Sequence, residues 1–215
     1  MINVRKEINK FLSTYKNRLS KTEIRFIRKQ TKDCIDPFPK LYLLMKVHKT
    51  PLKTRPVVSC SGSLLHPLGV WLDTVLQHIA TSLPSFIASW LYDLKEALQE
   101  IPGLPPNAKL FTADAVSMYT NIDTTSALNT INIFLRSSNS YKHLPIDIIL
   151  TGLELLMTNN VFQFGDCFFH QQTGTAMGTP PLLVAMQQYT TQFMSNFYSQ
   201  NILVIYFSIA DTLTM

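Results

Sequence analysis

The amino-acid sequence predicts an α+β fold, in which helices alternate with short strands. Several segments repeat apolar residues at the spacing of an amphipathic helix. Others are short apolar runs bounded by proline, glycine or polar residues, as strands are. A chain of 215 residues with 46% hydrophobic content is long enough to bury a sizeable core. We expect a globular protein made of a basic helical extension, residues 1–38, and a larger region, residues 39–215.

The first elements are two helices and a hairpin. Ile2–Lys16 and Thr22–Lys32 each place apolar residues on one face of a basic amphipathic helix. Lys40–Lys49 and Thr54–Cys60 then predict two strands joined by a turn near Pro51. Four cations lie on or near the tip of this hairpin: Lys46, Lys49, Lys53 and Arg55. Such a hairpin suits a triphosphate or a nucleic-acid backbone, although lysines also protect exposed sheet edges from aggregation.

The remaining elements follow from the same two patterns. In order, we expect helices over Leu64–Ala80 and Leu91–Glu100, a strand through Leu110 and Phe111 to Asp114, a helix capped by Thr124 or Thr125 and reaching about Leu135, a helix from Pro145 to about Thr158, a hairpin of Val161–Phe164 and Cys167–His170, a glycine-bearing loop over Gln172–Pro181 that opens onto a helix, and an apolar strand from Asn201 toward Asp211.

Charge is distributed unevenly along the chain. Residues 1–56 carry 15 Lys or Arg against 4 Asp or Glu, whereas residues 57–215 carry 4 against 10. Because cationic side chains on phosphates supply most sequence-independent nucleic-acid affinity, the basic first quarter favours a polyanionic partner. Solvated helices with lysine-rich faces would give the same pattern.

Three cysteines, Cys34, Cys60 and Cys167, are widely spaced and form no CxxC pair. They indicate reduced thiols in an intracellular protein rather than a disulfide framework or a zinc site. The apolar runs are far shorter than the roughly 20 residues that a bilayer requires, so no membrane association is expected. No clear nuclear localisation signal is present.

Asp114 and Asp211 are the candidate catalytic residues, since each follows an apolar strand. The ends of strands are where open sheets tend to present chemistry, although a lone Asp there also caps the next turn. Two such carboxylates side by side would bind two Mg²⁺ ions about 3.5 to 4 Å apart, the arrangement used in nucleotidyl transfer.

The chain resembles a reverse transcriptase, most closely the reverse transcriptase domain of Penelope-like retroelements. Four stretches carry the resemblance: KLYLLMKVHK with TRPVVSCSGS, then DAVSMYTNI, then NNVFQFGDCFFHQQTGTAMGT, and the strand near Asp211. Together they span roughly residues 39–212. The resemblance implies the fingers and palm of a right-hand polymerase, with an antiparallel palm sheet and packed helices, and without the family's thumb. It also implies an RNA template, a DNA primer, dNTPs and Mg²⁺ as partners, and nuclear residence would suit a retroelement.

The resemblance assigns roles residue by residue. Asp114 matches the first catalytic metal ligand, and Tyr119 matches the bulky residue that excludes a ribose 2′-hydroxyl. In the nucleotide-binding site, Lys46, Lys49 and Arg55 match the residues that hold the triphosphate. Gly174, Met177 and Gly178 match the loop beneath the nucleotide and template, where missing side chains permit a close backbone approach.

The last catalytic motif departs from the family. The family has two adjacent acids, whereas this chain offers Asp211 alone, between Ala210 and Thr212. Either neighbour could replace the lost acid, and the sequence leaves the register open. Two functions therefore remain: an active reverse transcriptase fragment, or a catalytically inactive remnant that at most binds nucleic acid. The sequence does not indicate the oligomeric state or the priming mode.

Overall fold

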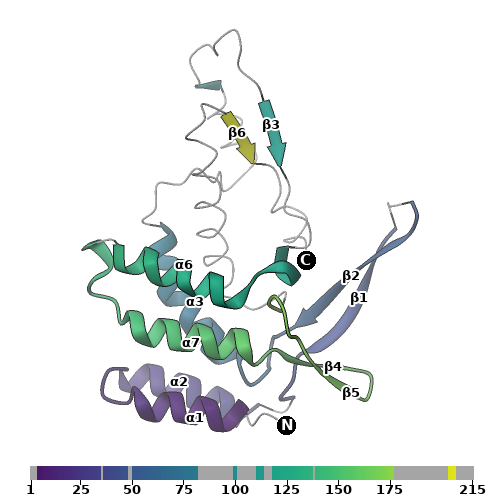
Figure 1. Ribbon diagram of the computed structural model, residues 1–215. Helices are drawn as coiled ribbons and strands as arrows, with labels where there is room; N and C mark the ends of the chain where they lie inside the picture. Colours follow the sequence, from purple (N-terminus) through teal and green to yellow (C-terminus); the bar gives the residue numbers. More distant parts are fainter. Residues whose placement is uncertain are drawn as a thin grey trace.

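The computed structural model describes residues 4–34, 36–47, 50–81, 99–100, 110–113, 118–137, 139–176 and 203–206 (Figure 1). For residues 78–81, 110–113, 118–119, 140 and 203–206 it describes the backbone alone.

The described elements confirm an α+β fold. They are, in chain order, α1 (Val4–Thr14), α2 (Lys21–Lys32), β1 (Lys40–Lys46), β2 (Lys53–Ser59), α3 (His66–Thr81), β3 (Leu110–Ala113), α5 (Met118–Asn121), α6 (Thr124–Ser137), the short 3₁₀ helix η1 (Asn139–Tyr141), α7 (Ile146–Thr158), β4 (Val161–Phe164), β5 (Cys167–His170) and β6 (Leu203–Tyr206). The helices expected over Leu91–Glu100 and after Pro181 lie wholly or almost wholly outside the described residues. None of the described helices is long and apolar enough to cross a membrane.

Five helices, α1, α2, α3, α6 and α7, form what we call the helical body. Helix α7 packs between α1 and α6, while α3 contacts both α2 and α7 (Figure 1). The apolar stripes of these helices meet in one core whose fully buried members include Ile8, Ile27, Leu68, Leu72 and Ile148. The predicted division at residue 38 stays a prediction, but the two helices before it share this core with the helices after it.

Polar contacts fix the first two helices against the rest of the body. The hydroxyl of Tyr15 lies 2.9 Å from that of Thr151, and Arg18 donates two hydrogen bonds to the carboxylate of Asp147. The indole Nε1 of Trp71 donates to Glu23 Oε1 over 2.7 Å. Hydrogen bonds require a defined geometry, so these contacts help to fix the orientation of α1 and α2 against α3 and α7.

Capping explains where two of the helices begin. Ser20 and Glu23 form a capping box at the start of α2, in which each side chain accepts the other's backbone N–H. At the start of α6, Asp123 Oδ1 accepts the backbone N–H of Ser126 over 2.6 Å. The expectation that Thr124 or Thr125 caps this helix is therefore wrong. The carboxylate one residue earlier reaches the free N–H groups of the first turn.

Two hairpins form a four-stranded sheet in the order β2-β1-β4-β5, which we call the hairpin sheet. Strands β1 and β2 are antiparallel, as are β4 and β5, and both hairpins match their predicted positions to within a few residues. The hairpins join at a single parallel pair, Lys40 with Gln163, where Gln163 N donates to Pro39 O over 2.8 Å.

The second sheet pairs β3 with β6 in parallel, from Leu110 with Leu203 to Ala113 with Tyr206. This pairing corrects the antiparallel arrangement that we expected for the palm strands. A parallel pair requires a long crossover, which the nearly 90 residues between these strands supply. Both strands consequently end at the same edge of the sheet.

Candidate nucleic-acid interface

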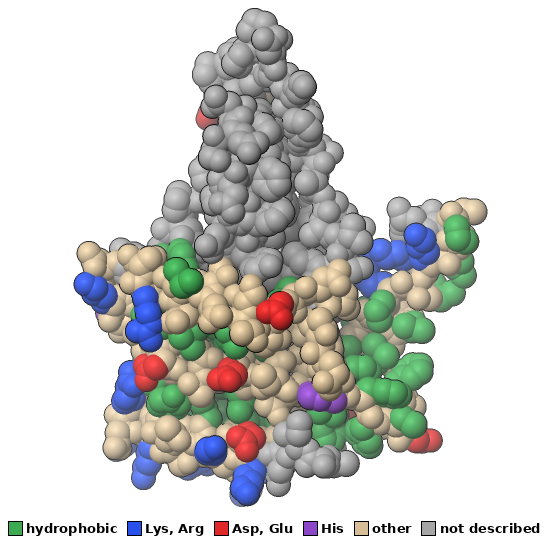
Figure 2. Space-filling view, viewed as in Figure 1, with side chains coloured by type: hydrophobic (Ala, Val, Ile, Leu, Met, Phe, Trp, Pro, Cys, Tyr) green, Lys and Arg blue, Asp and Glu red, His purple; other side chains and the backbone are tan. Residues whose placement is uncertain are grey.

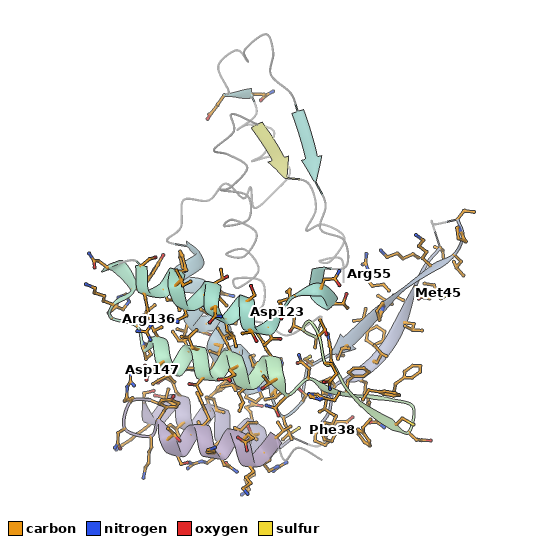
Figure 3. The ribbon with its side chains drawn as sticks, in the orientation of Figure 1. Phe38, Met45, Arg55, Asp123, Arg136 and Asp147 are labelled. Atoms are coloured by element: carbon orange, nitrogen blue, oxygen red, sulfur yellow. The ribbon has the colours of Figure 1, made fainter. Side chains whose placement is uncertain are left out.

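The β1–β2 hairpin projects from the body and carries cations on one face (Figure 3). Lys46 is the partner of Lys53, and Leu44 is the partner of Arg55. Because side chains two residues apart along a strand share a face, Lys46, Lys53 and Arg55 lie on the same side of the hairpin. We call these three residues the cationic face.

The pairing of Lys46 with Lys53 is unfavourable by itself, because like charges directly opposite one another destabilise an antiparallel pair. Lys53 is exposed, while Lys46 and Arg55 are half-buried. A polyanion against this face would turn the repulsion into attraction. The arrangement therefore concentrates positive charge on one face of the hairpin.

The sequence placed Lys53 among the four cations of the hairpin, but the resemblance assigned it no role in the nucleotide site. Its position opposite Lys46 follows once the two strands are put in register across the turn. Lys49, the third predicted nucleotide-binding cation, lies outside the described residues.

The base of the hairpin is anchored by a small apolar cluster. Val58, Cys60 and Ala176 are buried there, with Leu41 and Phe162 packed against them. Farther out, β1 exposes apolar side chains on both faces, including Leu43 at 49% and its neighbour Leu44 at 46%. Figure 2 shows hydrophobic side chains along this hairpin. The hairpin is thus held at one end and solvent-exposed along most of its length.

The glycine-bearing loop meets the segment that follows the Asp114 strand. The backbone N–H of Gly174 donates to Ile122 O over 3.0 Å. Gly174 has φ +77°, a backbone conformation that residues with a Cβ adopt at a cost. The next two residues, Thr175 and Ala176, are buried at 2% and 4% exposure. The structure therefore joins the end of DAVSMYTNI to the start of GTAMGT, two motifs that the sequence had paired only by resemblance.

The other predicted site residues lie outside the described residues or have only their backbone described. Asp114, Met177, Gly178 and Asp211 lie outside the described residues, and the backbone alone of Tyr119 is described, within α5. Asp114 follows directly on Ala113, the last residue of β3. In the described part of the chain, no three His, Cys, Asp or Glu side chains gather where they could hold a metal ion.

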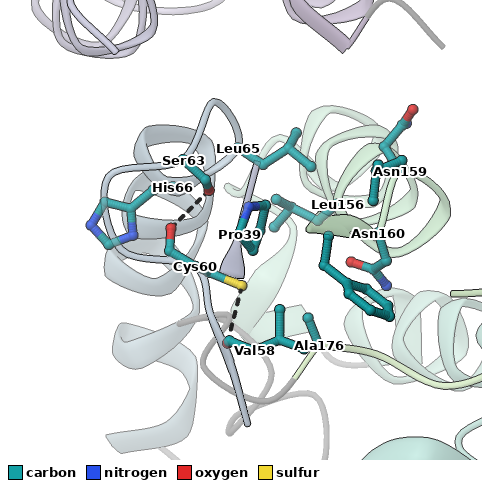
Figure 4. A pocket seen from close by; sticks show the side chains of 12 residues that line it. Pro39, Val58, Cys60, Ser63, Leu65, His66, Leu156, Asn159, Asn160 and Ala176 are labelled. Carbon is teal, nitrogen blue, oxygen red and sulfur yellow. Dashed lines mark hydrogen bonds between the residues drawn. The ribbon is translucent and has the colours of Figure 1, made fainter. Parts of the chain in front are cut away.

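A cavity of about 20 Å³ lies where β2, α3 and α7 meet (Figure 4). Its lining includes Cys60, Ser63, His66, Asn159 and Asn160. Ser63 Oγ donates to Cys60 O over 2.7 Å. Burial lowers the pKa of His66, which leaves the imidazole neutral at pH 7. The cavity has room for about one water molecule, so it is not a nucleotide site.

Comparison of this chain with protein-family models, with curated proteins and with solved structures finds no match. The geometry of the described residues and the motifs in the sequence are therefore the basis for a functional proposal.

Proposed function

We propose that the chain is the fingers and palm portion of an RNA-directed DNA polymerase, which extends a DNA primer along an RNA template with dNTPs. The main support is the hydrogen bond from Gly174 N to Ile122 O, because it joins the two motifs whose combination is most specific to reverse transcriptases. A chance likeness of two short motifs would not require them to meet. The parallel pairing of β3 with β6 differs from the antiparallel palm sheet that the resemblance implies, but it ends both strands at one edge of the sheet, one residue before Asp114 and five residues before Asp211.

The proposed roles of the side chains are positioning and charge neutralisation. Lys46 and Arg55, with Lys49, hold the triphosphate of the incoming nucleotide, and Lys53 contributes to the same positive field. Tyr119 excludes the ribose 2′-hydroxyl, while Gly174, Met177 and Gly178 line the nucleotide and template. Asp114 and Asp211 would hold Mg²⁺, which when bound would help to activate the primer 3′-hydroxyl and to neutralise the charge of the pyrophosphate leaving group.

Primer extension on an RNA template tests the proposal. The full chain should add dNTPs to an annealed DNA primer when Mg²⁺ is present, and Asp114→Asn should lower the rate by at least about 100-fold, because a metal carboxylate is lost. Lys142→Gln, which removes an exposed charge in the loop before α7, is the matched control and should leave the rate unchanged. Incorporation that survives Asp114→Asn would overturn the proposed active site.

The second candidate is a catalytically inactive remnant that at most binds nucleic acid. The observation in its favour is the single acid of the last motif, Asp211, between Ala210 and Thr212. If the unaltered chain is inactive, Ala210→Asp and Thr212→Asp test the two possible registers of the lost acid. Activity restored by one of them would identify the register and the ancestry together. Inactivity of both repaired chains would favour the remnant.

A further inference from the structure

The outward face of α2 carries a row of cations along its length. Ile27 and Thr31 are buried at 0% and 4% exposure, and Glu23 is held by the indole of Trp71. This packing leaves the rest of the helix surface in solvent. Lys21, Arg25, Arg28 and Lys32 are all exposed and follow one another at steps of four, three and four residues, so they form one stripe along a solvent-exposed flank of the helix. We call these four residues the α2 basic stripe.

The α2 basic stripe is a source of repulsion within its own helix. In the described part of the chain, ion pairs join Arg18 to Asp147 and Lys40 to Asp36, and none involves a residue of the stripe. Glu23, the acid within α2, accepts from Ser20 and Trp71 instead. Lys21 lies in the first turn, where the helix dipole disfavours a cation. Like charges at these spacings repel one another, although Lys32 lies in the last turn, where the helix dipole favours a cation.

The shape of the stripe suits the backbone of a duplex. Eleven residue steps from Lys21 to Lys32 cover roughly 16 Å at about 1.5 Å each. Over that length of the duplex axis one strand of B-DNA carries about five phosphates, and a straight row of cations faces those that are turned toward it as the strand winds. Single-strand sites usually add aromatic side chains on which bases stack, whereas the stripe contains none. The exposed Phe26 lies off the stripe, about 100° around the helix from Arg25. A row of cations without aromatic residues therefore favours a duplex, in which the bases are already stacked and the phosphates lie on the outside.

A membrane surface fits these observations less well. An interfacial helix inserts its apolar face among the lipids, but the apolar face of α2 is buried in the core of the helical body. Figure 2 shows Lys and Arg side chains along the edge of the molecule formed by α1 and α2, well apart from the cations of the β1–β2 hairpin. The two basic regions are thus separate surfaces of one molecule.

We propose that the α2 basic stripe binds the phosphate backbone of a nucleic-acid duplex without reading its sequence. It shares with the proposed function only the class of ligand, and it is a second binding surface, distinct from the cationic face of the hairpin. The side chains make no base contacts, so affinity depends on salt and on the number of phosphates neutralised.

Fluorescence anisotropy with 20-base-pair DNA and RNA duplexes of arbitrary sequence tests this proposal on the full chain. Arg25→Gln/Arg28→Gln should weaken duplex binding roughly tenfold at 50 mM salt, and should reduce the slope of log affinity against log salt by about one for each phosphate that is no longer neutralised. Gln keeps the helix propensity, and circular dichroism should show an unchanged fold. The matched control is Arg136→Gln/Lys142→Gln, which removes two exposed cations at the other side of the body and should change affinity less than threefold.

The outcomes separate this proposal from the polymerase. Equal losses of affinity with both double variants would overturn it, because net charge rather than the stripe would then set affinity. Tighter binding to a 20-nucleotide single strand, or binding to phosphatidylserine vesicles but not to either duplex, would also overturn it. A chain that adds no dNTP in primer extension but shows the expected duplex pattern supports the stripe and removes only the polymerase.

Discussion

The helical body and the hairpin sheet treat apolar side chains in opposite ways. In the body, Leu68, Leu72 and Ile148 are fully buried, each on the inward stripe of its helix. In the hairpin sheet, Leu43 and Phe168 remain 49% and 48% exposed, and β1 shows apolar residues on both faces. The body therefore supplies most of the buried apolar area that stabilises the chain. The sheet instead leaves several large apolar side chains exposed to water.

The largest loss of stability is expected from a substitution in the core of the helical body. Leu72→Ala removes a fully buried side chain that packs on Gly152, where an added Cβ would lie only 3.2 Å from Leu72. We expect the free energy of unfolding to fall by about 2 to 5 kcal/mol, because a cavity opens between α3 and α7. Urea denaturation followed by circular dichroism measures the change. A loss below about 1 kcal/mol would mean that the core does not lie where the structure puts it.

The contact between Trp71 and Glu23 should have the next largest effect. Burial opposes ionisation of Glu23, but hydrogen bonds from Ser20 and Trp71 outweigh it and hold its pKa below the usual value. Trp71→Phe should lower the free energy of unfolding by about 1 to 2 kcal/mol at pH 7. In a Glu23→Gln background the same substitution should cost less, and the difference is the strength of the interaction between the two side chains.

The same pair predicts a dependence on pH. A carboxyl with a lowered pKa in the folded state stabilises the fold above its unfolded pKa, and this contribution is lost as the pH falls through the folded pKa. Below about pH 4, stability should therefore decline more steeply in the native chain than in Glu23→Gln. Parallel denaturation series from pH 7 to pH 3 check this, and identical acid limbs would contradict the assignment.

The next prediction concerns Gly174, where the glycine-bearing loop contacts the segment before α6. Its φ of +77° is accessible to glycine at no cost, whereas an alanine there should lower the free energy of unfolding by about 1 kcal/mol. Gly62, with φ +75° and no atom within 4 Å of an added Cβ, is the matched control for backbone strain alone. If the polymerase proposal holds, Gly174→Ala should reduce primer extension far more than Gly62→Ala at equal stability.

The smallest effect is expected in the exposed part of the hairpin. Leu43→Ala should change the free energy of unfolding by less than about 0.5 kcal/mol, since nearly half of the side chain is already in water. The measurement is the same urea titration as for Leu72→Ala. A loss of stability comparable to that of Leu72→Ala would show that this face of the hairpin packs against something in the free protein.

Much of the fold could be predicted because local patterns determined it. The helical spacing of Ile8, Phe11 and Leu12 located α1, and Gly165 with Asp166 between two apolar runs located the β4–β5 hairpin. The parallel pairing of β3 with β6 could not be predicted, because no local signal gives the relative direction of two strands so far apart. The cap at Asp123 was missed because Thr124 and Thr125 are also good capping residues, and only geometry separates the three.

The candidate site was predictable where it depended on hairpin register and not where it depended on long-range contacts. Lys46 and Arg55 lie on one face because of the two-residue period of a strand, which is written in the sequence. The contact of Gly174 with Ile122 joins a residue before α6 to a residue after β5. It depends on how α6 and α7 pack as an antiparallel pair, and no spacing in the sequence predicts that packing. Asp114 and Asp211 remain sequence predictions, as they lie outside the described residues.

The contacts of Arg18 with Asp147 and of Tyr15 with Thr151 close loops of 129 and 136 residues. On the ribosome, α3 is translated soon after α1 and α2 and can pack against α2, but α7 follows much later. The apolar surface of α1 that packs against α7 therefore stays in water until α7 is made, and such delayed closure slows folding and exposes the nascent chain to aggregation and to chaperones. Synthesis that stops before α7 would release a polypeptide in which α1 lacks this partner.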